Sequence, residues 1–471
     1  MVSSNAWAAG EPPVSPGQSS GEGSNADFDL LIEGGTVVDP GQHWHAPMDV
    51  AVKDGKILEV SRNIPESRAR TVVSAKDRIV TPGFIDMHVH VYDGVFGMNA
   101  DHYCLARGTT TGVDAGTTGY FEIGVFIREV VQTQITRVFP LLNIKATGTI
   151  ANSIKYRSAD GKIERDIPDW QHPELTAKAA LEHKPYVVGI KARIGEDVQG
   201  NSEELDTLRM AVKAAETSHL PVMAHLDEMY IPLPDFLKLM RKGDVFTHFL
   251  NNHKHGVLDA NGKILPEVLE ARDRGIMFDV GQGVKPGRLS FDVAEKCFEQ
   301  GLFPDTISSD LGGFNYNAMN KVLVDLPNMV SKFMALGLDL DKAIACVTVN
   351  PTKAFDFGVQ IGTLRPGSEA DISIFELQEG TFTFWDNLGA QRTGRQRLAN
   401  KATVCRGEMF INEGLTDSMD DDPPVVGTLR SYERSVVPDA TDYRCSFFDT
   451  RLGGTGQRAG DHRAGSRRSQ S

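Results

Sequence analysis

The sequence has few cysteines, no long apolar run and no excess of basic residues. Its five cysteines include no Cys-x-x-Cys pair, which argues against a disulfide framework and against a cysteine-type zinc site. The net charge of -14 argues against nucleic-acid binding, because phosphate recognition needs a basic face. Residues 1–27 are rich in Ser, Gly, Pro and Ala, and they lack both a basic start and a continuous apolar stretch. We expect a disordered leader there, and a cytoplasmic protein that binds neither nucleic acid nor membrane. The sequence leaves a homo-oligomeric state open.

The rest of the chain divides into regions that differ in their pattern of apolar residues and turn signals. Residues 28–82 contain short β-type runs separated by turn signals, among them Asp54-Gly55, which is typical of a hairpin. Residues 83–352 alternate apolar runs of strand length with helical periodicity, the pattern of repeated βα units. Short β runs return in residues 353–415, so we predict that both ends of the chain build one small β-domain. Residues 416–471 contain an acidic run and then a Gly/Arg/Ser-rich stretch, and we expect a weakly ordered tail.

The central region contains eight strand candidates. They lie at residues 83–88, 111–114, 137–143, 186–191, 221–225, 245–248, 276–280 and 306–309. Eight parallel strands predict an α/β fold of the (β/α)₈ TIM-barrel type, in which functional residues sit at the C-terminal ends of the strands. An open doubly wound sheet is the alternative, but no Gly-rich nucleotide loop follows any of these strands.

Two histidines one residue apart, His88 and His90, end the first predicted strand. Alternate residues of a strand share a face, so both imidazoles can face the same point. Imidazole nitrogen suits Zn²⁺, which needs three or four donors, so the pair requires partners further along the chain. Taken alone, such a pair is as often a polar surface feature as a metal site.

Further side chains of ligand type end the later strands. These are Lys191, His225, His248 and Asp310. Singly, a histidine at a strand end is more often a hydrogen-bonded structural residue, and Asp310 could cap the following helix. Six such residues lie at the strand ends that surround one opening of the predicted barrel. Together they predict a shared metal site instead.

Lys191 is the unusual member of this set. A buried ammonium without a partner is costly and cannot bind a cation. Reaction with CO₂ would convert the amine into an anionic carbamate, whose two oxygens can bridge two metal ions. The alternative is an ordinary amine paired with a carboxylate.

Longer motifs make the chain similar to the amidohydrolase superfamily. The segments 243–248 (Gly-Asp-Val-Phe-Thr-His), 274–281 (Arg-Gly-Ile-Met-Phe-Asp-Val-Gly) and 304–310 (Pro-Asp-Thr-Ile-Ser-Ser-Asp) resemble its deacetylase group. Asn350-Pro-Thr-Lys-Ala354 resembles the return of the superfamily's chain to its β-sandwich. The resemblance places the chain in the binuclear branch with a carboxylated lysine, alongside dihydroorotases, hydantoinases and D-aminoacylases. It implies a TIM barrel with a small β-sandwich.

The resemblance also implies a ligand set and a mechanism. It places His88, His90 and Asp310 on the more buried ion, His225 and His248 on the second ion, and carboxylated Lys191 between the two. Two divalent ions, with Zn²⁺ the first expectation, would lower the pKa of a shared water so that hydroxide forms near neutral pH. Asp310 would then serve as the general acid/base.

The expected function is that of a metal-dependent hydrolase acting on a small acylated molecule. Members of the deacetylase group cut acetyl esters or acetyl amides of small hydroxy- or amino-carboxylic acids. Arg193 lies two residues beyond Lys191, where its planar fork would suit a substrate carboxylate, although a salt bridge at the rim is an equal alternative. The polar run 251–255 is expected to form a lid or specificity loop.

Two other enzyme readings stay open. One is a cyclic amide hydrolase similar to dihydroorotase or hydantoinase. The other is a mononuclear deaminase, because His225-Leu-Asp-Glu228 has the His-x-x-Glu spacing in which the glutamate acts as proton shuttle. Lys191 weighs against the deaminase, since a one-metal site needs no bridging carbamate. A non-catalytic relative should lack ligands, and none is missing.

Overall fold

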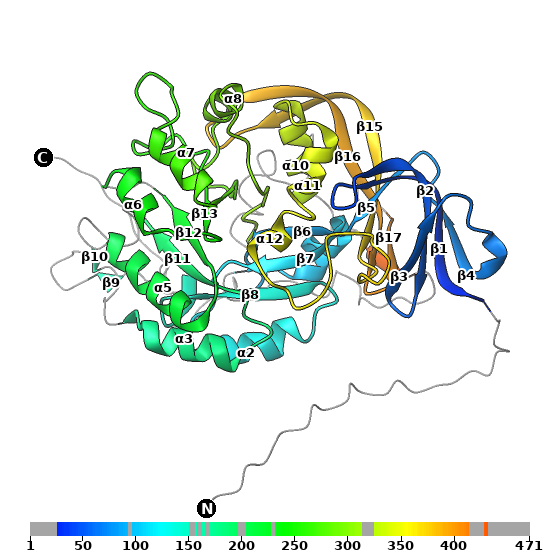
Figure 1. Cartoon of the computed structure of the whole chain (residues 1–471), viewed down its shortest axis with the longest axis horizontal. Helices are drawn as coiled ribbons and strands as arrows, with labels where there is room; N and C mark the ends of the chain where they lie inside the picture. The colour runs from blue at the N-terminus through cyan, green and yellow to red at the C-terminus, as the bar shows by residue number, and fades with distance from the viewer. Residues whose placement is uncertain are drawn as a thin grey trace, which may run out of the picture.

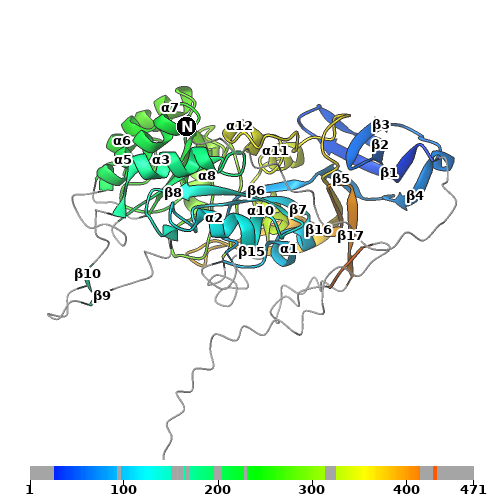
Figure 2. The ribbon, with the colours of Figure 1, turned by 90° about the horizontal axis from the view of Figure 1, so that it is seen from below.

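The computed structural model describes residues 26–92, 97–149, 156–157, 163–164, 170–195, 204–227, 231–312, 325–413 and 428–431. In these residues one parallel sheet and one mixed sheet dominate, and they lie next to each other (Figures 1 and 2). The described residues also include a separate two-stranded ribbon of β9 (Tyr156–Arg157) and β10 (Ile163–Glu164). The predicted leader lies outside the described residues except for its last two positions.

The parallel sheet has seven strands in the described part of the chain, in the order β14-β13-β12-β11-β8-β7-β6. The strands are β6 (Phe84–Val89), β7 (Thr109–Asp114), β8 (Arg137–Asn143), β11 (Gly189–Ile194), β12 (Val222–Leu226), β13 (Val245–Thr247) and β14 (Met277–Asp279). Most of their residues are buried, as expected for parallel strands that are covered on both faces. Seven of the eight predicted strands are therefore confirmed, with shifted boundaries.

The eighth predicted strand, residues 306–309, is not a strand in the structure. The segment joins both edges of the sheet through two isolated bridges, Asp279 to Thr306 and Val89 to Leu311. The amide of Asp310 also donates to the carbonyl of His88 at 2.7 Å. Asp310 itself has φ 52°, a left-handed conformation that an extended strand cannot contain. The sheet therefore curls toward a barrel, and an irregular segment stands where the last strand was predicted.

Helices connect the parallel strands and pack against the sheet (Figure 1). They are α1 (Ala100–Tyr103), α2 (Ile123–Phe126), α3 (Pro173–Glu182), α5 (Glu204–Ser218), α6 (Leu233–Leu239), α7 (Pro266–Asp273), α8 (Phe291–Glu299), α10 (Leu326–Ala335), α11 (Leu340–Ala345) and α12 (Pro351–Ala354). Side-chain caps define the starts of four of them, α1, α8, α10 and α11. Ser290 accepts a hydrogen bond from the amide of Val293 at 3.4 Å, and Asp325 accepts one from the amide of Asn328 at 2.7 Å.

Strands from both ends of the chain form the mixed sheet. In the described residues it has nine strands, ordered β18-β17-β16-β15-β5-β1-β2-β3 with β4 beside β1. They are β1 (Phe28–Asp39), β2 (Trp44–Lys53), β3 (Lys56–Ser61), β4 (Ala69–Ser74), β5 (Ile79–Pro82), β15 (Ile372–Trp385), β16 (Gln391–Cys405), β17 (Glu408–Glu413) and β18 (Thr428–Ser431). Pairing of β5 with β15 joins the two parts into one continuous sheet. The β-sandwich expected from the resemblance stays a prediction.

One local feature of the mixed sheet agrees with the sequence prediction and a second departs from it. The predicted hairpin between β2 and β3 turns at Asp54 and Gly55, whose φ angles of 49° and 73° are those of the tight hairpin turn that this pair favours. The second feature lies in the predicted weakly ordered tail, from which Thr428–Ser431 adds strand β18 to the edge formed by β17.

Strands β15 and β16 form a long hairpin that leaves the mixed sheet and reaches the helices around the parallel sheet (Figure 1). At its turn, Asp386 accepts a hydrogen bond from the amide of Phe291, at the start of α8, at 3.0 Å. Along its length, the amide of Leu398 donates to the hydroxyl of Ser331 on α10 at 2.9 Å. The last part of the chain therefore contacts the loops that follow the parallel strands.

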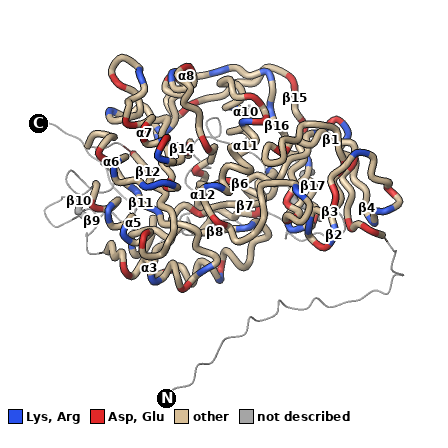
Figure 3. Tube along the Cα trace, viewed as in Figure 1, with Lys and Arg blue, Asp and Glu red and all other residues tan. Residues whose placement is uncertain are grey.

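The described residues contain no helix with both the length and the apolar content needed to cross a lipid bilayer. Lysine, arginine, aspartate and glutamate are distributed along both sheets and their helices (Figure 3). The cysteines agree with the sequence analysis: four are buried and unpaired, and Cys445 lies outside the described residues.

Candidate metal centre

The predicted ligands meet at the C-terminal end of the parallel sheet. All six are buried, and none is more than 8% exposed. Three lie within strands β6, β11 and β12, and three directly follow β6, β13 and the irregular eighth segment. In this order the residues are His88, Lys191 and His225, then His90, His248 and Asp310.

A first group consists of His88, His90 and Asp310. Asp310 Oδ1 lies 3.2 Å from His88 Nε2 and 3.3 Å from His90 Nε2. One ligand atom from each residue falls within 4.8 Å of the other two, close enough to surround a metal ion. This is the set of side chains that the resemblance assigned to the more buried ion.

A second group consists of His88, His225 and His248, again with ligand atoms within 4.8 Å of one another. His225 Nδ1 and His248 Nε2 are 2.9 Å apart. The amine of Lys191 lies 3.2 Å from His88 Nε2, the nitrogen that the two groups have in common. The lysine therefore lies where a bridge between two ions would be needed.

Hydrogen bonds behind His90 fix which of its nitrogens faces the group. Its Nδ1 lies 2.8 Å from the hydroxyl of Thr117, and that hydroxyl lies 2.8 Å from Asp114 Oδ2. An ionised carboxylate only accepts, so the single hydroxyl hydrogen goes to Asp114 and the threonine oxygen accepts from Nδ1–H of His90. Nε2 is then left with a lone pair directed at the cluster, as a metal ligand requires.

The same arrangement stands behind His88. Its Nδ1 lies 3.0 Å from the hydroxyl of Thr247, which donates to Asp279 Oδ2 at 2.7 Å. Asp279 also accepts hydrogen bonds from the hydroxyls of Thr306 and Ser308, at 2.8 and 2.7 Å. The irregular eighth segment therefore helps to orient a histidine of the first strand.

Hydrogen-bonding partners outside the cluster also hold the imidazoles of His225 and His248. Asp227 Oδ2 lies 2.8 Å from His225 Nε2, and the carbonyl of Gly281 contacts His248 Nδ1. All four histidines therefore keep one ring nitrogen in the cluster and the other against a hydrogen-bonding partner. This is the arrangement by which proteins orient histidine ligands around a metal ion.

The protonation states suit cation binding. Burial lowers the pKa of His88 and of His225 well below its usual value, and nearby positive charge adds to the effect. Burial, with the Arg288 cation, lowers the pKa of His248 to about 3. Burial raises the pKa of Asp310, but the Arg288 cation and a hydrogen bond with His90 outweigh it and bring the value to about 2. Neutral imidazoles and an ionised carboxylate result, the forms that bind metals.

Lys191 does not form the amine–carboxylate pair that was its alternative reading. In the described part of the chain, its amine makes hydrogen bonds with His88 Nε2 at 3.2 Å and Met223 Sδ at 3.3 Å. Burial lowers its pKa to about 7, against the raising influence of Asp310 and Asp279. A substantial fraction of the amine is therefore neutral near pH 7, and the neutral form is the one that reacts with CO₂.

Sequence reasoning missed two residues of the centre, Asp227 and Arg288. The Nε of Arg288 lies 3.2 Å from Asp227 Oδ1, its Nη1 contacts Asp310 Oδ2, and its Nη2 lies 3.4 Å from His225 Nε2. Asp227 could have been found, because it follows His225 by two residues at the same strand end. Arg288 lies in an irregular loop without any periodic signal.

The other predicted residues lie around this centre. Arg193 Nη2 lies 3.4 Å from Asp227 Oδ2, so it borders the cluster, and its role in substrate binding stays a prediction. Asn251, the first residue of the predicted specificity loop, is buried and donates to the carbonyl of His248 at 2.7 Å. Glu228 lies outside the described residues.

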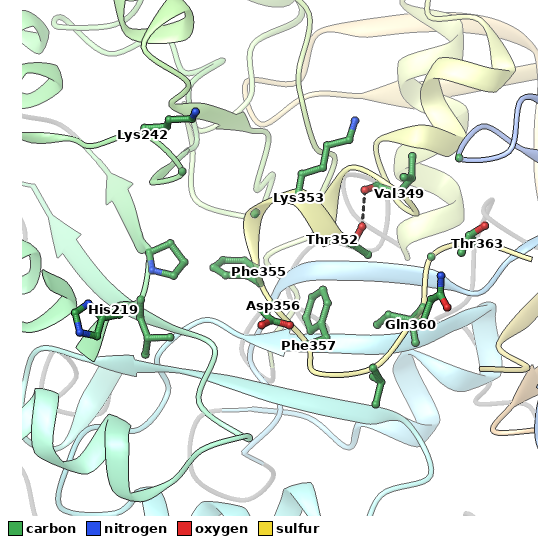
Figure 4. A pocket seen from close by; sticks show the side chains of 18 of the residues that line it. His219, Lys242, Val349, Thr352, Lys353, Phe355, Asp356, Phe357, Gln360 and Thr363 are labelled. Atoms are coloured by element: carbon green, nitrogen blue, oxygen red, sulfur yellow. Dashed lines mark hydrogen bonds between the residues drawn. The ribbon is translucent and has the colours of Figure 1, made fainter. Parts of the chain in front are cut away.

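A cavity of about 880 Å³ lies elsewhere, next to the segments that precede β12 and β13 (Figure 4). Its walls include His219 and Lys242 from these segments, and Lys353 and Phe355 from α12 and the residue after it. It therefore opens near the N-terminal ends of the strands, opposite the metal centre.

Known proteins resemble this chain over most of its length. The model of the amidohydrolase family matches residues 79–410. A deacetylase of Enterococcus faecalis is 32% identical over 391 residues, which are 82% of this chain and 100% of the deacetylase. A crystal structure of an adenine deaminase is 31% identical with a TM-score of 0.72, covering 82% of this chain and 100% of that one. A dihydroorotase structure, 24% identical with a TM-score of 0.70, covers 81% and 99% and shares the fold.

Proposed function

Because the chain belongs to the amidohydrolase family and is thus a metal-dependent hydrolase, we propose that it removes acetyl groups from small hydroxy- or amino-carboxylic acids. The observation that carries the proposal is the pair of overlapping ligand groups that have His88 in common, with the amine of Lys191 beside it. The resemblance to a deacetylase along that protein's whole length supports the acetyl group as the part removed.

The described side chains fit two divalent cations. His88, His90 and Asp310 would hold one, His225 and His248 the other, and a carbamate on Lys191 would bridge them. When bound, two such ions, Zn²⁺ foremost, supply Lewis acidity toward the substrate carbonyl and a water of lowered pKa. The outer partners Thr117, Thr247 and Asp227 hold the imidazoles in place, so little reorganisation is needed as the charge develops.

Asp310 is the proposed general acid/base. Its Oδ1 faces His88 and His90, while its Oδ2 faces Arg288 and lies 3.9 Å from His248 Nε2. Its pKa of about 2 keeps the carboxylate ready to accept a proton from the attacking water. The same group would then return that proton to the leaving alkoxide or amine.

We further infer that the parallel sheet closes as an eight-membered barrel, with residues 306–311 as its irregular last member. Bridges to both edges of the sheet support this closure. The barrel would occupy residues 83–352, and residues 28–82 with 353–415 would form the small β-domain.

A substrate screen on the metal-loaded protein tests the proposed function. The panel consists of N-acetyl-D- and N-acetyl-L-amino acids, O-acetyl hydroxy acids and cyclic imides. The proposal expects release of acetate from at least one acetylated acid. Hydrolysis of cyclic amides alone, with no acetate released from any acyclic acid, would replace it with the cyclic amide hydrolase reading.

Adenine deamination is the second candidate, favoured by the solved adenine deaminase that shares 31% of its residues with this chain. In that reading His225 would hold a single ion and Glu228 would act as the proton shuttle. Release of ammonia from adenine by protein carrying one ion per chain would support it. The place of Lys191 beside His88 weighs against it, because one ion needs no bridge.

A further inference from the structure

The turn of the β15–β16 hairpin holds both ends of the loop that follows β14. Asn387 Oδ1 accepts a hydrogen bond from the amide of Leu289 at 3.2 Å, and its Nδ2 donates to the carbonyl of Gly283 at 3.0 Å. The backbone amide of Asn387 also donates to the carbonyl of Leu289 at 3.2 Å. One residue from the last part of the chain therefore fixes both ends of the loop 283–289.

This loop carries Arg288 to the metal centre. The guanidinium contacts Asp310 from the first ligand group and lies 3.4 Å from His225 Nε2 of the second. Its Nε donates to Asp227 at 3.2 Å, which sets the orientation of the planar group. Arg288 is only 8% exposed, so its position is defined by packing as well as by charge.

The backbone of this loop also lies close to the charged groups of Asp310 and Arg288. Gly283 has φ 54°, and a Cβ atom there would lie 2.5 Å from Asp310 Oδ2 and 2.8 Å from Arg288 Nη1. Only glycine accepts both this conformation and this approach without displacing the charged groups. A shift of the loop would therefore be passed directly to Arg288.

The proposed substrates carry a carboxylate, so their binding needs a cation beside the metal ligands. In an α-acyloxy or α-acylamino acid, a short chain of covalent bonds separates the acyl carbon from the carboxylate. A carbonyl at the metal centre therefore brings the carboxylate to residues that border the ligands, as Arg288 does. The guanidinium has five donors in a planar fork. Its Nε and Nη2 contact Asp227 and its Nη1 contacts Asp310, so a substrate carboxylate would share the Nη groups with these partners.

We propose that Arg288 binds the carboxylate of the acylated acid and that Asn387, from the β15–β16 hairpin, positions Arg288 for this task. The inference rests on the proposed function, because it requires a carboxylate beside the acyl group. It gives the mixed sheet a part in substrate selection. Arg193, which shares Asp227 with Arg288, would reinforce the same subsite.

Three variants separate these roles. Arg288→Lys keeps a positive charge near Asp227 and Asp310 but loses the planar fork. Asn387→Ala leaves Arg288 intact and removes the two side-chain hydrogen bonds, to Leu289 and Gly283, that hold the ends of its loop. Leu388→Ala is the matched control, because Leu388 is the next residue of the same turn and its side chain is 50% exposed.

The measurement is calorimetric binding of lactate, a small hydroxy acid, and of its neutral amide, lactamide, to the zinc-loaded full chain. Metal content and melting temperature are recorded for every variant. We expect the affinity for lactate to fall about 10- to 100-fold in Arg288→Lys and in Asn387→Ala, the range for loss of a charge-assisted hydrogen bond. Lactamide should change by less than about twofold, and Leu388→Ala should match the wild type.

Each other result overturns part or all of the inference. Unchanged lactate binding in Arg288→Lys, or equal losses for lactate and lactamide, removes the role of Arg288. A loss in Arg288→Lys without one in Asn387→Ala removes the role of Asn387. Because binding needs no turnover, the two failures are distinguishable: Arg288-dependent lactate binding by a protein that deacetylates nothing would refute the proposed function, and with it the acylated acid as ligand, while Arg288 would remain a carboxylate-binding residue.

Discussion

The two ends of the parallel sheet differ in the side chains that meet there. Before β12 and β13, a cavity of about 880 Å³ is lined by residues of mixed type, including His219, Lys242 and Phe357 (Figure 4). There the amine of Lys353 binds its neighbour Asn350 at 2.8 Å. After the same strands, His225 and His248 converge with His88 until their ligand atoms lie within 4.8 Å.

Convergence of side chains therefore distinguishes the end that carries the candidate metal centre. The C-terminal ends of parallel strands bring side chains from distant parts of a chain to one place. At this end each imidazole is also held from behind by a partner such as Thr117 or Asp227, which fixes its tautomer. The cavity at the opposite end has space without such an arrangement among its described lining residues.

The largest expected effect is the loss of activity in Lys191→Ala. Without the amine no carbamate can form, so kcat/KM should fall at least about 1000-fold, as when a main source of charge stabilisation is removed. Acetate or propionate in the assay should restore part of the rate by standing in for the carbamate. Full activity of Lys191→Ala without added acid would reject the bridge.

A smaller effect is expected for Asp227→Asn. The amide oxygen accepts from His225 Nε2 without the negative charge of the carboxylate, so the hydrogen bond weakens and the affinity for one of the two ions should fall about 10- to 100-fold. Competition with a chelator measures this affinity. Asp235→Asn, an exposed carboxylate on α6, is the control and should bind both ions like the wild type. Equal affinities in the two variants would deny Asp227 its supporting role.

The rate of activation should depend on pH through Lys191. Burial lowers the pKa of its amine from 10.5 to about 7, so the neutral, CO₂-reactive fraction grows as the pH rises through 7. At a fixed concentration of dissolved CO₂, metal-free protein should gain activity faster at pH 8 than at pH 6 after Zn²⁺ is added. A rate that is equal at both values, or faster at pH 6, would contradict the lowered pKa.

The smallest effect is expected at the opposite end of the sheet. His219→Ala and Lys353→Ala alter the walls of the cavity without touching any metal ligand, so kcat/KM should stay within about twofold of the wild type. Steady-state kinetics on the best substrate of the screen measure this. A tenfold loss in either variant would show that the cavity takes part in the reaction, and it would remove the contrast between the two ends.

Local sequence predicted the strands and therefore the ligands that end them. His88, His225 and His248 were found because an apolar run shows where a strand ends, and the barrel geometry then brings these ends together. The prediction of the eighth strand was wrong because the conformation of its segment depends on contacts with both edges of the sheet. These contacts are the two isolated bridges, and the left-handed Asp310 lies between them. Such contacts leave no local pattern in the sequence.

The loop of Arg288 could not be predicted for a related reason. Asn387 and Leu289, which join the hairpin to this loop, are 98 positions apart. The contact between them depends on the length and the direction of the β15–β16 hairpin, which extends beyond the mixed sheet. The two residues that make the contact determine neither the length nor the direction of the hairpin. The sequence therefore predicted which side chains converge at the candidate metal centre, while the support around them required the fold.

The number of metal ions bound per chain decides whether Lys191 and the four histidines hold a binuclear centre. Protein loaded with Zn²⁺ and dialysed is measured by elemental analysis, and ¹³CO₂ labelling followed by NMR detects a carbamate. The account predicts two ions in the wild type, at most one in Lys191→Ala, and a carbamate signal that requires Lys191. A single ion in both proteins, with no carbamate signal in either, would contradict it.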